Sequence, residues 1–128
     1  MAWNVREDCI TLKALNDFTN MQWRIIELAT SEPNAADYAA GGRGHGILFN
    51  EPRQYEAATV VVTGECRVRA GKAIAIGDRI TAAASGANGS GWATNATSGG
   101  LSGKILGVAR SACASGSLFT MEFVKVEL

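Results

Sequence analysis

The feature that most constrains this chain is an unbroken alternation of side-chain character between residues 59 and 70. One parity is apolar or small and consists of Val60, Val62, Gly64, Cys66, Val68 and Ala70. The other parity is polar, with Val61 as its single apolar member. A period of two over this length predicts one β-strand, or two strands joined at a bulge at Gly64, with one buried face and one solvated face.

The composition is that of an ordinary folded domain, with 128 residues, 47% hydrophobic and 19% charged. This length suits a single domain with one adequate core. Twelve basic and twelve acidic side chains cancel, so no net field draws the chain to nucleic acid or to an anionic membrane. A charge near zero also removes one protection against self-association, which fits a subunit of an assembly.

Cysteine usage and hydropathy predict a protein that folds in a reducing cytoplasm. Cys9, Cys66 and Cys113 are odd in number, lie far apart and form no metal-binding spacing, so they are interpreted as buried free thiols. No charged segment followed by an apolar segment opens the sequence, and no apolar run approaches ~18 residues. We therefore expect neither a signal peptide nor a membrane span.

Short alternating segments separated by glycine-rich turns recur along the chain. Strands are expected at residues 9–15, 21–30, 46–49, 59–70, 79–83, 92–94, 104–109 and 118–128. The segment 21–30 also contains a weaker helical stripe, but its β-branched and aromatic residues favour a strand. About nine short strands without a convincing amphipathic helix predict an all-β fold, a small single-domain β-barrel or β-sandwich.

The remaining segments are assigned to an arm, loops and turns. Residues 1–8 form an extended N-terminal arm and residues 9–128 the single β domain. Residues 31–37 are expected to be a loop, residues 38–46 a flexible glycine-rich loop, Ile74 and Ile76 a short apolar hook between turns, and residues 111–117 a connector of small residues. In the last strand the apolar parity changes after Phe123, which predicts a bulge there. No internal repeat of fixed period is apparent.

The sequence contains no recognisable catalytic, cofactor or metal motif. His45 is the single histidine and lies between two glycines, a poor place to hold a base in register. The glycine-rich stretches fail the phosphate-loop patterns, because Ile47 replaces the third glycine of one and Ile105 replaces the magnesium-binding Ser/Thr of the other. We therefore expect no catalytic residues, no cofactor and no metal, and a protein that is not an enzyme.

The order and spacing of several bland motifs resemble the capsid decoration, or cement, proteins of tailed bacteriophages. The motifs are a Gly46-Ile-Leu strand, an Asn-x-Pro turn, Glu-Ala-Ala-Thr-Val, a Val-x-Gly step, Ala-Gly-x-x-Ile and Gly-Asp-x-Ile-Thr. Further along, Ile105 to Ala109 and a closing apolar strand also resemble the family, so that the likeness covers about two-thirds of the chain. A long segment at residues 31–44 and the Trp-bearing arm depart from the pattern.

This resemblance implies a virion protein that binds the outer surface of the icosahedral head and bridges subunits of the major capsid protein. It also implies a homo-oligomer, a trimer in preference to a dimer, made in the host cytoplasm and without a nucleic-acid or membrane partner. The alternative is a phage tail or surface module that recognises a host receptor or glycan. Exposure arguments alone select the capsid-contact residues, which are Ala2, Trp3, Asn4, Val5, Arg6, Gly42, Arg43 and His45.

Overall fold

The computed structural model describes residues 7–38, 44–82, 93–95 and 104–127, and these residues form an all-β fold. The strands are β1 (Glu7–Ala14), β2 (Ile25–Leu28), β3 (Ala35–Tyr38), β4 (Gly46–Leu48), β5 (Ala57–Arg69), β6 (Arg79–Ala82), β7 (Ala93–Asn95), β8 (Lys104–Ala109) and β9 (Leu118–Glu127). The expected fold class, a small β-barrel of short strands, is confirmed. Within the described ranges no helix is long and apolar enough to cross a membrane.

Strands β1 to β4 and the first half of β5 close into a five-stranded barrel. The order is β1-β3-β2-β4-β5, and β1 pairs again with β5 from Lys13↔Ala57 to Glu7↔Gly64. The β1–β3 pairing is parallel and the others are antiparallel. The interior is apolar and includes Leu12, Ala14, Phe18, Met21, Ile26, Ala36, Leu48, Ala58 and Val60. Closure leaves this barrel without a bare sheet edge.

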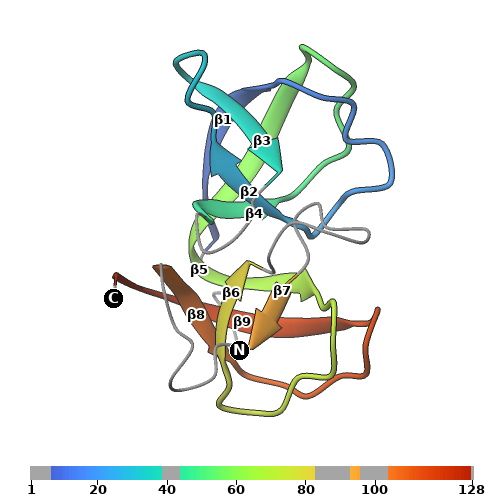
Figure 1. Cartoon of the computed structure of the whole chain (residues 1–128), viewed down its shortest axis with the longest axis vertical. Helices are drawn as coiled ribbons and strands as arrows, with labels where there is room; N and C mark the ends of the chain where they lie inside the picture. Colours follow the sequence, from blue (N-terminus) through green and yellow to red (C-terminus); the bar gives the residue numbers. More distant parts are fainter. Residues whose placement is uncertain (1–6, 39–43, 83–92, 96–103, 128) are drawn as a thin grey trace, which may run out of the picture.

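The second half of β5 continues into another sheet, in the order β5-β9-β8-β6-β7. This sheet curls until Ala70, just beyond β5, meets Ala93 of β7 through one parallel bridge, and it is called the second barrel below. The amide of Gly71 also donates to the carbonyl of Ala93 at 2.8 Å. Figure 1 shows the resulting arrangement, in which the two curled sheets are stacked along the long axis and share β5.

A bulge in β5 allows one strand to serve both cores. Asp8 of β1 is opposite Thr63, whereas Cys9 is opposite Val61, so Val62 is the extra residue. Val60 therefore lies in the core of the first barrel, and the adjacent Val61 belongs to the core of the second sheet. The expected bulge exists, but it lies at Val62 rather than at Gly64, which follows with a φ of 92°. The expected single buried parity was wrong, because Val61 is fully buried.

The second core holds side chains from both halves of the molecule. Ile25, Ile47 and Val61 belong to strands of the first barrel, yet they pack with Cys66, Val68, Ala70, Ile74, Ile80, Leu106, Phe119 and Met121. Trp23 packs on the same cluster, and its carbonyl accepts the amide of Arg69 at 2.9 Å. The two barrels are therefore one packed domain rather than two independent ones.

Several local expectations are confirmed and others are corrected. β8 has the expected bounds, and β9 carries the expected bulge, because Gly107 opposite Phe123 and Ile105 opposite Val126 leave two β9 residues facing one of β8. The expected strand at 21–30 shortens to β2, since Trp23 adopts a left-handed φ of 71°. The expected loop at 31–37 ends early: Asn34 turns the chain with a φ of 56°, and β3 follows.

Candidate docking surfaces

The expected contact residues mostly lie outside the described part of the chain. This applies to Ala2, Trp3, Asn4, Val5, Arg6, Gly42 and Arg43. β1 begins at Glu7, inside the segment assigned to the arm. His45 is half-buried, its amide donates to the carbonyl of Ile26 at 2.7 Å, and Gly44 and Gly46 beside it are buried. The exposure argument for this loop was therefore wrong at Gly44 and Gly46.

Two turns at the end of the second barrel are built as a matched pair. Residues 71–77 precede β6, and residues 111–117 precede β9. Ile74 and Cys113 exchange backbone hydrogen bonds, each 3.0 Å long. On either side of that bridge, the amide of Gly77 donates to Ala109 O at 2.8 Å and the amide of Gly116 donates to Ala70 O at 2.8 Å. Exchanging the two turns leaves this pattern of donors and acceptors unchanged, so the pairing has local twofold pseudosymmetry about the Ile74–Cys113 bridge.

The two paired turns also share a sequence pattern. The pattern Ala-x-x-Ala-x-Ala-x-Gly runs from Ala70 to Gly77 and again from Ala109 to Gly116. Both glycines have a left-handed φ, of 90° and 82°, which glycine adopts without steric cost. This is one recurrence of a short motif rather than an internal repeat of fixed period, so the expectation that the chain has no such repeat is unchanged. A single recurrence of small residues is too short to stand out before the structure brings the two copies together.

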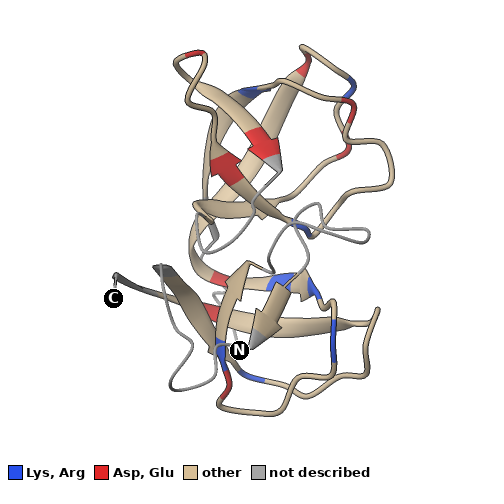
Figure 2. Ribbon diagram, in the orientation of Figure 1, with Lys and Arg blue, Asp and Glu red and all other residues tan. Residues whose placement is uncertain are grey.

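The matched turns expose apolar groups and little charge. Ile76 is 73% exposed, and Ala73, Ala75, Ala112 and Ala114 are also exposed. Within the segment expected to be an apolar hook, Ile74 is buried and Ile76 is exposed. Lys72 is the one charged residue in the first turn, and the second turn has none. Figure 2 shows both turns as mainly tan ribbon, without blue or red over most of their length, in the lower part of the view.

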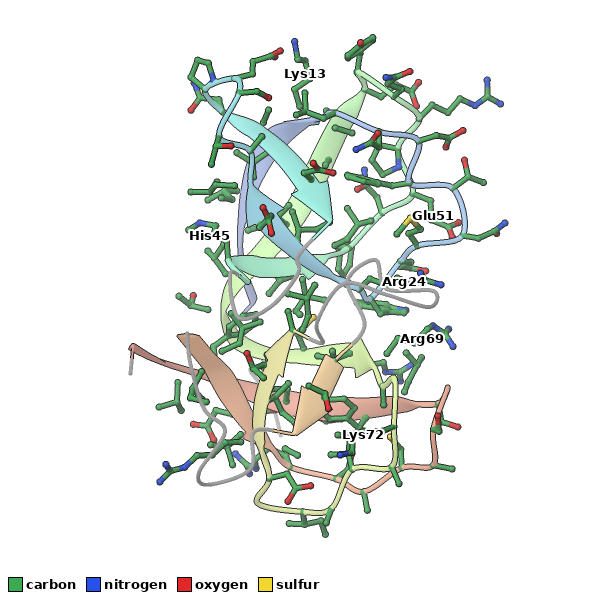
Figure 3. The ribbon with its side chains drawn as sticks, viewed as in Figure 1. Lys13, Arg24, His45, Glu51, Arg69 and Lys72 are labelled. Carbon is green, nitrogen blue, oxygen red and sulfur yellow. The ribbon has the colours of Figure 1, made fainter. Side chains whose placement is uncertain are left out.

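The opposite end of the molecule is rich in charge. There Lys13 forms an ion pair with Glu32, and its ammonium group lies 5.5 Å from the centre of the Tyr55 ring. Tyr55 is 64% exposed with a left-handed φ of 70°, and its amide donates to Ala14 O at 2.7 Å. The turn is closed by Glu56, whose carboxylate accepts the amide of Arg53 at 2.7 Å. Figure 3 places Lys13 at this end and Lys72 in the other barrel.

A charged cluster and a partly buried thiol lie elsewhere in the second barrel. The guanidinium of Arg110 lies 2.8 Å from Glu122 and 3.1 Å from Glu65, on the outer face of the second sheet. Burial raises the pKa of the Cys113 thiol, and a backbone hydrogen bond to Ile74 opposes that rise. In the part of the chain that the structure describes, no group of three His, Cys, Asp or Glu side chains is arranged to hold a metal.

The chain has structural similarity to a known phage protein. No protein-family model matches the chain, and no curated protein matches it. The structure is similar to the crystal structure of the N base of head fiber gp8.5 in bacteriophage phi29, with a TM-score of 0.70. The match covers 96% of this chain and 100% of that chain at 17% sequence identity. The two chains share a fold. Because the match covers the whole gp8.5 N base chain and nearly all of this chain, the shared fold includes both stacked barrels.

Proposed function

We propose that this chain is a structural protein of a bacteriophage head, which binds the outer surface of the shell and stabilises contacts between capsomers of the major capsid protein. One observation carries the proposal: the fold matches the base of a phage head fiber over 96% of this chain. The order of motifs from Gly46 onward, which resembles phage cement proteins, supports the same class independently of the fold.

The geometry of the molecule suits such a role. A closed barrel leaves no sheet edge for uncontrolled pairing, and a second sheet packed on it makes a rigid body. A small rigid protein can strengthen a shell through modest contacts repeated at many symmetry-related positions. We propose a homotrimer, in keeping with the family resemblance, and no catalytic activity, cofactor, nucleic-acid partner or membrane partner. Residues 2–6 with Gly42, Arg43 and His45 stay proposed contacts.

Reconstitution on heads that lack the protein tests the proposal. The purified chain is added to such heads, and binding is measured by co-sedimentation while head stability is measured by thermal disruption with release of DNA. We expect saturable binding and a higher disruption temperature. Binding without stabilisation would restrict the role to decoration, and absence of binding to heads would refute the proposal. Cryo-electron microscopy of the decorated heads would then locate the chain and show its oligomeric state.

The alternative role, recognition of a host receptor or glycan, is favoured by one feature. Tyr55 presents an aromatic ring on a turn held by hydrogen bonds, and exposed aromatic rings of this kind serve as anchors in recognition surfaces. Copy number separates the two roles. Hundreds of copies per virion support the shell role, whereas a handful of copies supports a receptor-binding module.

A further inference from the structure

We propose that the matched turns at the end of the second barrel, residues 71–77 and 111–117, form a further surface that docks on the shell, in addition to the contacts proposed above, with Ile76 as its central anchor. This inference rests on the proposed function and specifies which end of the molecule faces the partner. The partner surface it fits is an apolar, uncharged patch of a folded protein.

The first argument is the exposure of Ile76. An isoleucine that is 73% exposed lies at the tip of a turn whose ends are fixed by backbone hydrogen bonds. The carboxylate of Asp78 adds a further restraint, because it accepts the amide of Ala75 at 2.9 Å. A side chain presented from such a rigid turn loses little backbone freedom when a partner covers it, which is the basis of preorganised binding.

The second argument is the distribution of charge between the two ends. Protein interface cores are depleted of charged residues relative to the rest of the surface. Residues 111–117 carry no charge and residues 71–77 carry only Lys72, whereas the Tyr55 end carries Lys13, Glu32, Arg53 and Glu56. Burial of the charged end against a partner would cost desolvation at each unmatched group. The two turns, with Lys72 as their single charged residue, are therefore the surface that can be covered at lower cost.

The third argument concerns the size of the patch and selects the occupant. A stable pairwise protein interface uses roughly 20–30 residues on each side. The two turns together supply fewer residues than that, so this surface alone is too small to hold a stable dimer of the chain. A small contact on each copy is sufficient when the copies are joined in the proposed trimer, because binding of one copy raises the effective concentration of the others at the shell. This favours the shell protein over a second copy as the occupant.

The test compares two matched substitutions in the full chain. Ile76→Asp places a charge at the centre of the proposed surface, and Tyr55→Asp places the same charge at another well-exposed position on the opposite end. Aspartate tolerates the left-handed conformation at residue 55. Circular dichroism and thermal melting confirm that each variant is folded. Binding to heads that lack the protein is then measured by co-sedimentation over a range of concentrations.

We expect Ile76→Asp to weaken binding by about 30-fold or more, the size of a typical anchor residue, and Tyr55→Asp to bind like the unsubstituted chain. Ala114→Asp, on the second of the matched turns, should also weaken binding. If the unsubstituted chain binds and Ile76→Asp binds equally well, the docking surface is wrong while the proposed function stands. If Ile76→Asp instead changes the oligomeric mass of the isolated chain, the turns are a self-interface and the inference is overturned. If the unsubstituted chain does not bind heads, the proposed function itself fails.

Discussion

Replacing Val60 or Val61 with alanine tests whether the two barrels unfold as one unit. These neighbours in β5 have no exposed surface, and their side chains belong to different cores. Each substitution removes two methyl groups, worth about 0.8 kcal/mol each on burial, and leaves a small cavity. The expected loss is about 2 kcal/mol in the free energy of unfolding. With an unfolding entropy of about 2.1 cal/mol/K per residue, the melting temperature should fall by about 7 °C.

Differential scanning calorimetry at fixed protein concentration is the appropriate assay, because association would make the melting temperature depend on concentration. We expect a single transition in each variant, shifted by a similar amount, since Ile25, Ile47 and Val61 tie the first barrel to the second core. Arg67→Thr, on the exposed side of the same strand, is the control and should change the unfolding free energy by no more than about 0.5 kcal/mol. Two separate transitions, one lowered by Val60→Ala and the other by Val61→Ala, would refute the reasoning.

Two further predictions concern packing and pH. Gly107→Ala should destabilise the fold by about 1–3 kcal/mol, measured by urea denaturation. The reason is that the added Cβ would overlap the carbonyl oxygen of Glu122 and lie 2.8 Å from Met121 Cγ. A change below about 0.5 kcal/mol would show that β8 and β9 can move apart at little cost. The hydroxyl of Thr19 donates to the carboxylate of Asp17 at 2.5 Å, and that bond, with the Thr19 amide, lowers the Asp17 pKa below its ordinary 3.8. Because the pKa is lower in the folded state, the ionised carboxylate stabilises the fold at pH values above the unfolded pKa, and this stabilisation is lost as pH falls through the folded pKa. Thr19→Val should therefore raise the Asp17 pKa measured by NMR titration. An unchanged Asp17 pKa would contradict this cause.

The strand content of the molecule could be predicted from the sequence because strands are local patterns. Lys104–Ala109 was predicted with its observed bounds, and the change of apolar parity after Phe123 revealed the β9 bulge. β3 was missed, since Ala35–Tyr38 has no β-branched residue and is held by pairing with β1 and β2 on its two sides. Propensity is weak evidence where neighbouring strands supply all the stabilisation.

The exposed residues of the candidate docking surface could not be predicted from the sequence. Exposure was inferred from glycine content, yet Gly44 and Gly46 are glycines because other side chains leave no room: a Cβ would lie 2.7 Å from Ile25 at the first and 2.5 Å from Val60 at the second. Conversely, Ile76 was predicted only as part of a short apolar hook, and it is the most exposed of the large hydrophobic residues in the described ranges. Residue type does not distinguish a glycine that permits close packing from a glycine that permits motion.

The alternation from Thr59 to Ala70 by itself determined that a long, half-buried strand lies at the centre of this protein, because a period of two has no other regular solution. Only the tertiary structure decided that this strand serves two cores, since the bulge at Val62 depends on how β1 pairs with it. The tertiary structure also brought Ile74 and Cys113 together from distant segments. Contacts between residues far apart in the chain are set by the closure of the two sheets, and that closure depends on all the strands at once.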